Sequence, residues 1–525
     1  MTIASFLKSL IRAPFFAIVC VLIGMVLSAL ILFANVLIHL IAGAEYGLAN
    51  DVVTVIAKHL PIALGVLGFI AAFVTENIAT SVFGTARWAN DRELKELAAG
   101  DDGLLIGRDP ASGDLLRYDG PAHLLTMAPT RTGKGVGTVI PNLLTADRSI
   151  ICIDPKGENA DITGRARERF GPVHVLDPFE ATDQKSSAYN PLDVLGPEGL
   201  DVAEDASTLA DALVYDEPGT GGEAHWNEEA KALVAGLILK IVVAESPGRR
   251  HLGTLREYLT LAPERFLALL ARMQAMDEAN GLIARTANRH LGKSDREAAG
   301  VLSAAQRHTH FLDSPRMTAV LSRSDFGFAD LKRRNVSIFL VLPPDRLSNY
   351  ARWLRLLVAQ SLSAMARERT AARRPVLYLL DEFAALGHLA PVERAMGLMA
   401  GYGVQLWPIL QDIHQLRATY GRLAGTFLSN AAILQVFGVN DIETAELIAR
   451  TIGKRDANYI TQSWSKGATS SSEHIAARDL INADEILRLS GKKMILLRQG
   501  QSPAVVAKIR YFEDKEFDGL FTRPQ

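Results

Sequence analysis

A phosphate-binding loop narrows the possible folds of this chain more than any other sequence feature. The apolar residues His123 to Met127 predict a β-strand, which runs directly into the segment Ala-Pro-Thr-Arg-Thr-Gly-Lys-Gly at residues 128–135. A helix is predicted to open immediately afterwards, so that its N-terminus and the N–H groups of the loop could cradle polyphosphate. A strand, a glycine-bearing loop and a helix in this order predict an α/β domain that binds a nucleotide.

The nucleotide contacts are predicted from positions within this loop. Lys134 is the cation placed to reach the outer phosphates, and Gly133 lets the backbone approach them closely. Two positions depart from the usual pattern, because Ala128 replaces the first glycine and Gly135 stands where a Mg²⁺-binding Ser or Thr is usual. The full set of predicted contacts is Ala128, Pro129, Thr130, Arg131, Thr132, Gly133, Lys134, Gly135 and Val136.

Two adjacent carboxylates form the second half of the predicted site. The apolar run Val376–Leu380 ends in Asp381 and Glu382, where Asp381 would hold Mg²⁺ through water and Glu382 would activate the attacking water. For an Asp-Glu pair alone, an ordinary strand-end turn is the preferred interpretation. The loop around Lys134 reverses this preference, and the chain is therefore predicted to be an NTPase.

A third element of the site is predicted at the end of the apolar run Val404–Leu410. Gln411 follows this run, and its amide could sense the γ-phosphate from a strand tip beside the nucleotide. A glutamine that caps a helix is the alternative, and the residues alone do not separate the two.

The N-terminal region is predicted to anchor the chain in a membrane. Residues 13–38 carry no charge over about 26 positions, which is enough to cross a ~30 Å hydrocarbon core with some tilt. A second span is predicted at about residues 56–76, for which a buried amphipathic helix is the alternative. A hairpin of two spans is preferred because Gly65, Gly68 and the pair Ala71-Ala72 offer a small-residue surface for helix packing in lipid.

Charged residues around the two spans predict their orientation. Basic residues precede the first span and follow the second, whereas the intervening loop carries Glu45 and Asp51 with little positive charge before Lys58. The positive-inside rule therefore places both termini in the cytoplasm. Only two cysteines occur, Cys20 and Cys152, which excludes a disulfide framework and suits a reducing cytoplasm.

Alternating β and helical patterns predict a doubly wound α/β domain. Continuous runs of Val, Ile and Leu are typical of parallel strands that are buried on both faces. Further strands of this kind are predicted at 149–153, 173–176, 336–342, 432–439 and 505–511, with helices such as 350–369 and 441–451 between strands. The segment Gln462–Glu473 is rich in Ser, Thr and Gly and is predicted to be a mobile loop.

The spacing of the two half-sites predicts an inserted helical domain. Lys134 and Asp381 lie about 250 residues apart, which exceeds what a compact nucleotide-binding core requires. The excess, from about Tyr215 to Arg316, is poor in strands, so that a small all-helical domain inserted in the sheet is the economical explanation. Its predicted helices are 226–244, 252–261, 263–276, 279–290 and 294–308, with 216–222 as the entry loop.

Charged clusters outside the site allow two interpretations. The net charge is −2, so that the chain lacks the overall positive charge that would indicate binding to nucleic acid. The clusters 332–334 and 367–374 could line a DNA channel through phosphate contacts, but solvated helix ends are preferred for each. The segment Asp154-Pro-Lys-Gly-Glu158 is either part of the active-site rim or a solvated turn, with about equal weight.

The chain resembles the type IV secretion coupling proteins of the TraG/TraD kind, which are membrane-anchored relatives of the RecA-like and FtsK-like motor ATPases. The resemblance covers nearly the whole chain and rests on the loop at 128–137 together with further motifs. These motifs are Gly84-Thr-Ala-Arg-Trp-Ala89, Pro121-Ala-His-Leu-Leu125, Val139-Ile-Pro-Asn-Leu-Leu144, Asp154-Pro-Lys-Gly-Glu-Asn159, Tyr189-Asn-Pro-Leu192, Leu380-Asp-Glu-Phe383, Gly401-Tyr-Gly403 and Leu410-Gln411.

This resemblance implies a RecA-like P-loop NTPase domain (81–214 and 317–525), an inserted all-α domain for substrate recognition (215–316) and an N-terminal two-helix transmembrane anchor (1–80). It implies a homohexamer at the bacterial inner membrane, driven by ATP with Mg²⁺. Such an assembly passes substrate, either a relaxase bound to single-stranded DNA or effector proteins, to components of the secretion channel. The family's site positions fall on Lys134, Asp381, Glu382 and Gln411.

Two other classes of function remain as alternatives. An FtsK-like translocase of double-stranded DNA is disfavoured by the helical insertion, the two-span hairpin and the lack of a winged-helix-like tail. A nonmotor receptor that binds ATP only to assemble is disfavoured by Glu382, because a pure nucleotide switch needs no water-activating base. The sequence does not decide between the two kinds of cargo. A hydroxyl that binds Mg²⁺ could come from Thr132 or Thr138, and Arg131 and Arg394 are the candidates for an arginine that acts on a neighbouring subunit.

Overall fold

The computed structural model describes residues 3–42, 48–75, 82–100, 102–215, 224–465 and 468–523. The chain divides into two compact units. The smaller unit comprises residues 1–85 and 455–477, and the larger comprises residues 86–454 and 478–525. All residues of the predicted nucleotide site lie in the larger unit.

The larger unit is built on an eleven-stranded mixed sheet with the order β2-β1-β13-β12-β9-β3-β8-β7-β4-β6-β5. The seven strands from β9 to β5 are parallel, and the other four extend the sheet antiparallel from β9. The bounds are β1 (Leu104–Arg108), β2 (Leu115–Tyr118), β3 (His123–Met127), β4 (Ile150–Asp154), β5 (Val173–Leu176), β6 (Ser337–Val341), β7 (Val376–Leu380), β8 (Val404–Leu410), β9 (Ala431–Val436), β12 (Lys493–Arg498) and β13 (Ala504–Ala507).

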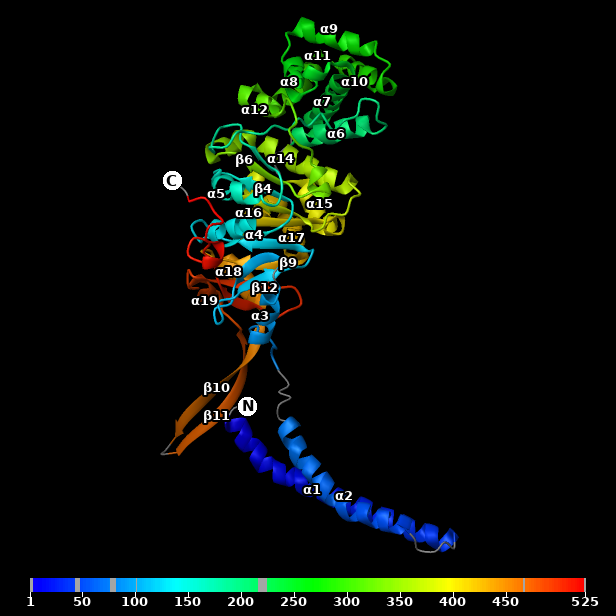
Figure 1. The fold of residues 1–525 in the computed structure, drawn as a ribbon, viewed down its shortest axis with the longest axis vertical. Helices are drawn as coiled ribbons and strands as arrows, with labels where there is room; N and C mark the ends of the chain where they lie inside the picture. The colour runs from blue at the N-terminus through cyan, green and yellow to red at the C-terminus, as the bar shows by residue number, and fades with distance from the viewer. Residues whose placement is uncertain are drawn as a thin grey trace. The chain divides into compact units, whose positions relative to one another are not determined.

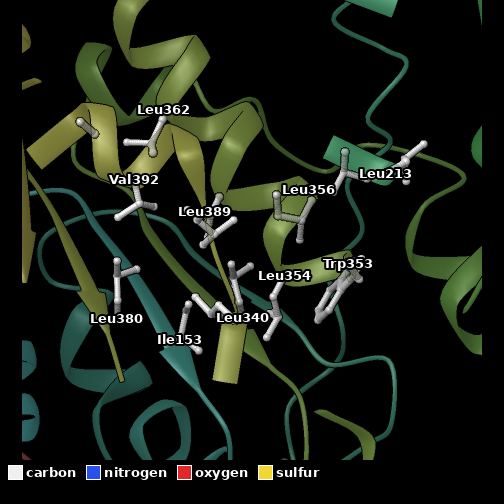
Figure 2. Close-up of a cluster of buried hydrophobic side chains, with 14 of the residues drawn as sticks. Ile153, Leu213, Leu340, Trp353, Leu354, Leu356, Leu362, Leu380, Leu389 and Val392 are labelled. Carbon is white, nitrogen blue, oxygen red and sulfur yellow. The ribbon is translucent and has the colours of Figure 1, made fainter. Parts of the chain in front are cut away.

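The central parallel strands are buried on both faces, which explains their continuous apolar sequences. In β7, Tyr378 and Leu380 pack into one hydrophobic core, whereas Leu377 and Leu379 pack into a second core on the opposite face. Figure 2 shows part of the first core, in which side chains of β4, β6 and β7 lie with Leu354 and Leu356 of the helix α14 (Pro344–Arg367). The predicted α/β fold with parallel strands is confirmed.

Strand predictions succeeded best in the parallel part of the sheet. The bounds predicted for β3, β5, β7 and β8 agree with the structure, and those of β4, β6 and β9 are within a few residues of it. The antiparallel strands β1, β2 and β12 were not predicted. The prediction of a mobile loop at Gln462–Glu473 is wrong, because its described residues belong to the long strands β10 (Lys454–Ser465) and β11 (Ala468–Asp479), which pair with each other.

Helices of the larger unit cover the sheet and form a separate helical group beyond α14 (Figure 1). Those near the sheet are α3 (Asp91–Ala98), α4 (Ile140–Thr145), α5 (Glu158–Arg167), α13 (Asp330–Arg333), α14, α15 (Ala390–Leu398), α16 (Ile413–Tyr420), α17 (Ala424–Asn430), α18 (Ile442–Ile452) and α19 (Ala483–Leu487). The helical group comprises α6 (Val202–Leu213), α7 (Ala224–Ala244), α8 (Leu252–Leu259), α9 (Pro263–Gln274), α10 (Leu282–Leu291), α11 (Asp295–His308) and α12 (Pro315–Val320).

The helix α7 is the centre of the helical group. It packs against α6, α8, α10 and α11, and its apolar residues are buried around most of its circumference. Gly236 lets α10 approach closely, because a Cβ at this position would lie 2.2 Å from the methyl carbon of Thr286. The predicted entry loop at 216–222 lies outside the described residues.

The helical group is inserted between two neighbouring strands of the sheet. The chain leaves the sheet after β5 and returns in β6, which pairs with β5 in parallel. The outgoing and returning segments are bonded to each other: the Tyr189 amide donates to the Val320 carbonyl (2.8 Å) and the Asp325 amide donates to the Ala188 carbonyl (3.0 Å). The insertion is therefore an enlarged crossover connection with a closed neck.

The smaller unit contains two helices that are long and apolar enough to cross a membrane. These are α1 (Ile3–Ala42) and α2 (Leu48–Thr75), with candidate spans at Ala13–Ile38 and Asp51–Ile70. They pack against each other at small residues, since a Cβ on Gly65 would lie 2.6 Å from Val21 Cγ2 and a Cβ on Gly68 would lie 2.6 Å from Cys20 Sγ. The predicted glycine contacts between the two helices are confirmed.

This packing makes a disulfide between α1 and α2 possible in a single-site variant. In Gly68→Cys, the new Cβ would lie 2.9 Å from Cys20 Cβ, so that the helices must separate slightly to reach the Cβ–Cβ distance of about 3.5–4.5 Å in a disulfide. After this small shift, mild oxidation of the full chain in membranes should cross-link the two helices within one molecule. Cys152 is buried and should not react. Digestion and mass spectrometry would detect the bridge. The matched control is Leu67→Cys, an exposed position, and equal cross-linking of both variants would contradict this helix pairing.

Candidate nucleotide-binding site

The site lies where three neighbouring parallel strands end. The register pairs Met127 of β3 with Leu410 of β8, and Leu380 of β7 with Pro408 of β8. The Ala128 amide continues the ladder by donating to the Leu410 carbonyl (2.8 Å). Residues that directly follow these strands therefore meet at one edge of the sheet, as is usual for ligand sites in parallel α/β folds.

The loop after β3 has the compact form expected of a phosphate-binding loop. The Thr132 amide and hydroxyl both donate to the Pro129 carbonyl, at 3.2 and 2.6 Å. Arg131 (φ 64°) and Gly133 (φ 90°) have left-handed backbone conformations, for which glycine is best suited. The Gly137 amide donates to the Gly133 carbonyl (2.8 Å). The π-helical turn Gly135–Val139 follows, in which the Ile140 amide donates to the Gly135 carbonyl, and it leads into α4.

Exposure differs among the predicted contact residues. Ala128 and Pro129 are buried, Thr130 and Arg131 are exposed, and the remainder of the loop to Val136 is partly buried. A Cβ on Gly135 would meet no atom within 4 Å, so that the space beside this residue is open to a ligand.

Lys134 is held by both predicted catalytic carboxylates. Its Nζ lies 2.9 Å from Asp381 Oδ1 and 2.5 Å from Glu382 Oε1. Burial alone would lower the pKa of Lys134, but the two carboxylates outweigh this effect and raise it, so that the ammonium stays charged. Burial raises the pKa of Asp381, and the positive charge of Lys134 only partly offsets this rise.

Glu382 and Gln411 are also brought together. The Gln411 side-chain amide donates to Glu382 Oε2 (3.4 Å), and the Glu382 amide donates to Asp381 Oδ1 (2.9 Å). Glu382 has a left-handed backbone (φ 49°, ψ 41°), which is unusual for a residue other than glycine. Gln411 does not cap a helix with its side chain; α16 is capped by Asp412, which accepts from the Gln415 amide.

The surroundings fit a magnesium ion bound mainly through nucleotide phosphates. The described residues contain no group of three or more His, Cys, Asp or Glu side chains that could hold a metal by themselves. Asp381 offers a carboxylate next to the loop, which is sufficient for Mg²⁺ in sites where phosphates and water supply the other ligands. Thr138 is not available as a ligand, because its buried hydroxyl donates to Gln435 Oε1 (3.1 Å).

Asp154 is buried at the end of β4 and caps the helix α5, whereas Lys156 and Glu158 in the same segment are exposed. Asp154 Oδ2 accepts from the Ala160 amide at the start of α5 (2.9 Å), and Gly157 has φ 76°. Burial, together with the charge of Asp381, raises the pKa of Asp154 to about 7. Lys156 points to solvent near Glu158. Asp154 thus has a structural role that needs no ligand.

Six of the seven basic residues in the clusters 332–334 and 367–374 contact acidic groups or carbonyls, and the seventh, Arg369, is exposed. Lys332 is buried and donates to the Met365 and Glu368 carbonyls (2.7 and 2.8 Å). The arginines at 333, 334, 367, 373 and 374 each contact an aspartate or a glutamate. These contacts favour the interpretation that the clusters are surface charges rather than the lining of a DNA channel.

Lys508 is a site residue that sequence reasoning missed. It follows β13, and its Nζ donates to the Thr132 carbonyl in the phosphate-binding loop (2.9 Å) while lying 4.9 Å from the ring centroid of Phe437. Burial lowers the pKa of Lys508 to about 8. A lysine near the C-terminus carries no local motif, so that only tertiary structure reveals its contact with the loop.

We expect Lys508→Met to raise the KM for ATP about tenfold with little change in kcat, because the charged hydrogen bond that holds Thr132 is lost. In the unmodified protein, Lys508 is protonated below its pKa of about 8 and loses its charge as the pH rises through that value. The KM of the unmodified protein for ATP should therefore increase as the pH rises through about 8, and the KM of Lys508→Met should not show this increase. Steady-state kinetics between about pH 6.5 and 9.5 would measure this.

The matched control is Lys508→Arg, which stays charged over the whole range. Lys508→Arg should keep a low KM for ATP, and this KM should not rise with pH. Indistinguishable pH profiles of KM in all three proteins would contradict the role given to Lys508.

The comparisons with known proteins agree with this geometry. Residues 87–524 match the family model described as "Type IV secretory system Conjugative DNA transfer". Among curated relatives, the conjugal transfer protein TraG of Escherichia coli is 29% identical over 82% of this chain and 75% of its own length. The protein VirD4 of Rhizobium rhizogenes is 30% identical over 83% of this chain and 67% of its own length.

Solved structures of a coupling protein share the fold. The plasmid coupling protein TrwB in complex with the ATP analogue ADPNP has a TM-score of 0.64 and 18% identity, covering 85% of this chain and 99% of TrwB. TrwB in complex with ADP and Mg²⁺ gives the same TM-score, with 19% identity and coverage of 84% and 98%. From the matched residues and the shared fold, the chain belongs to the type IV secretory system family of conjugative DNA transfer proteins.

Proposed function

We propose that this protein is an ATP-driven coupling protein of a type IV secretion or conjugation system. It recruits substrate, a relaxase–single-stranded DNA complex or an effector protein, and drives delivery to the secretion channel. The observation that carries the proposal is the contact of Lys134, which follows β3, with both Asp381 and Glu382, which follow β7. Gln411 follows β8, the strand between them, and contacts Glu382. This arrangement is a hydrolytic site of P-loop type rather than a simple anion site.

Each residue has a distinct part in the proposed reaction. The loop amides and Lys134 would bind the phosphates of ATP, and Asp381 would hold Mg²⁺ through water. Mg²⁺, when bound, neutralises charge that develops on the phosphates. Glu382 orients and deprotonates the attacking water, and Gln411 senses the γ-phosphate from the tip of β8.

Binding of ATP requires an exchange of partners at Lys134. In the structure, the Lys134 ammonium is neutralised by Asp381 and Glu382. Phosphate oxygens would replace these carboxylates as partners of Lys134, which frees Glu382 to face the attacking water. Glu382, the general base, is thus released by ATP itself.

The other parts of the chain fit the same function. The spans in α1 and α2 anchor the protein in the bacterial inner membrane, with both termini in the cytoplasm by the positive-inside rule. Six copies assemble around a channel, and the helical insertion at about 215–316 recognises the cargo. TrwB, which shares the fold, is described in complexes with ADPNP and with ADP and Mg²⁺, and this supports ATP and Mg²⁺ as ligands here.

Lys134→Ala should abolish nucleotide binding, because it removes the cation placed for the β- and γ-phosphates. Isothermal titration of the full chain in detergent with ATP and Mg²⁺ would measure the affinity. The exposed lysine variant Lys515→Ala, which makes the same charge change away from the loop, serves as the control. Unchanged affinity in Lys134→Ala would overturn the site assignment.

Glu382→Gln should retain ATP binding but lower turnover about a hundredfold or more, because an amide cannot take the proton of the attacking water. Phosphate release measures turnover, and cell-to-cell transfer of DNA or effector measures the biological step. Glu446→Gln, on the exposed side of α18, should leave both unchanged. Undiminished turnover in Glu382→Gln would refute the role of Glu382 as the base.

A further inference from the structure

A series of ring contacts joins the catalytic strand end to Tyr215, which lies between α6 and α7 of the helical insertion. Phe383, directly after Glu382, stacks on Tyr420 with ring centroids 5.7 Å apart and an interplanar angle of 8°. The Tyr420 ring lies 5.0 Å from that of His388. His388 in turn stacks on Tyr215, with centroids 6.4 Å apart and an angle of 13°.

Two tyrosine hydroxyls fix the backbone that follows the catalytic residues. The His388 amide donates to the Tyr215 hydroxyl (3.2 Å), and the Leu389 amide donates to the Tyr420 hydroxyl (3.3 Å). Leu389 itself is buried in the core with side chains of α14 and α15 (Figure 2). The segment from Phe383 to Leu389 is therefore held both by the core and by the two tyrosines.

The helix α14 extends this series towards the insertion. The guanidinium of Arg355 lies over the Tyr215 ring, with its Cζ 3.4 Å from the ring centroid. One turn earlier, Arg352 Nη2 donates to His308 Nδ1 on α11 (3.2 Å) and approaches the Tyr215 carbonyl (3.5 Å). Two arginines of one helix thus contact Tyr215, between α6 and α7, and the helix α11.

His308 connects the two central helices of the insertion. Burial, reinforced by the charge of Arg352, lowers the pKa of His308 to about 3, so that its imidazole is neutral. Because Nδ1 accepts from Arg352, the proton resides on Nε2, which donates to Asn227 Oδ1 on α7 (2.8 Å). The contacts therefore run without interruption from Glu382 to both α11 and α7.

Glu382 is the residue in this series that must change its conformation. Its carboxylate is 2.5 Å from Lys134 in this structure and has to leave when phosphate takes its place. Its left-handed backbone is strained for a glutamate, so that the surrounding contacts must hold it in place. Any movement of this backbone is transmitted first to Phe383, the next residue in the chain.

We infer that Tyr215 and Tyr420 are positioning residues through which the helical insertion controls the orientation of Glu382. This inference rests on the proposed function, and it concerns the regulation of the same site. Cargo held by the insertion changes the rate of hydrolysis through these rings rather than the affinity for ATP. In the reverse direction, Glu382 must leave Lys134 when ATP binds, and the same contacts carry this movement to the insertion.

The first test separates kcat from KM in the full chain. Tyr215→Leu should lower kcat for ATP hydrolysis about fivefold or more, with KM unchanged within about twofold. Tyr215→Phe keeps the stacked ring and should retain most of the activity. The matched control is Phe266→Leu, which removes a buried ring of the insertion that contacts His290 but lies outside the series. An equal effect of Phe266→Leu and Tyr215→Leu would overturn the inference.

A double-mutant cycle tests whether the distant ends of the series are coupled. His308→Ala and Tyr420→Leu should each lower kcat, and the double variant should be less impaired than the product of the two effects, because both interrupt the same series. Independent, multiplicative effects would show that His308 does not act through Tyr420 and would contradict the inference.

Hydrogen exchange tests the inference even where a ring variant fails to fold. In Glu382→Gln, addition of ATP and Mg²⁺ should change exchange at the His388 and Leu389 amides and also in α7 and α11. Changes confined to the loop and the ends of β7 and β8 would overturn the coupling. An unmodified protein that neither binds nor hydrolyses ATP would instead overturn the proposed function, and the coupling with it.

Discussion

The common edge formed by the ends of β3, β8 and β7 is the constraint on which the site depends. Three segments that are far apart in the sequence end side by side because their strands pair in parallel register. Parallel pairing requires a crossover for each strand, and the crossover helices bury the sheet on both faces. Removing the Lys134 ammonium from water costs free energy, and its ion pairs with Asp381 and Glu382 offset this cost. Gln411 donates a further hydrogen bond to Glu382.

The sequence revealed the parallel half of the fold better than the antiparallel half. The strands β7 and β8 are continuous apolar runs, and such runs are distinctive because both faces are buried. In contrast, β1 contains Gly107 at a register irregularity, and β12 begins with an exposed lysine, so that neither has a clear strand pattern. The ribbon of β10 and β11 has the Ser- and Thr-rich composition of a linker, and its strands are defined by pairing with each other.

The site itself was predictable where a motif has a local cause. Lys134, Asp381, Glu382 and Gln411 follow strands in a recognisable pattern, and the structure brings all four together. Lys508 has no such pattern, since it reaches the loop only through the antiparallel strand that precedes it. The same limit applies to Thr138, whose hydroxyl is engaged by Gln435 of β9, a partner that sequence spacing could not show.

The position of the insertion explains how a large helical group can coexist with this site. It replaces one crossover, between the neighbouring strands β5 and β6, so that both of its ends return to the same part of the sheet. A closed neck at Ala188 and Asp325 limits the strain that the insertion places on the strands. The next element after β6 is α14, which is packed into the sheet core and also carries the arginines that contact Tyr215 and His308. A single helix therefore belongs to both the nucleotide core and the wall of the insertion, and a conformational change in either one must be accommodated by the other.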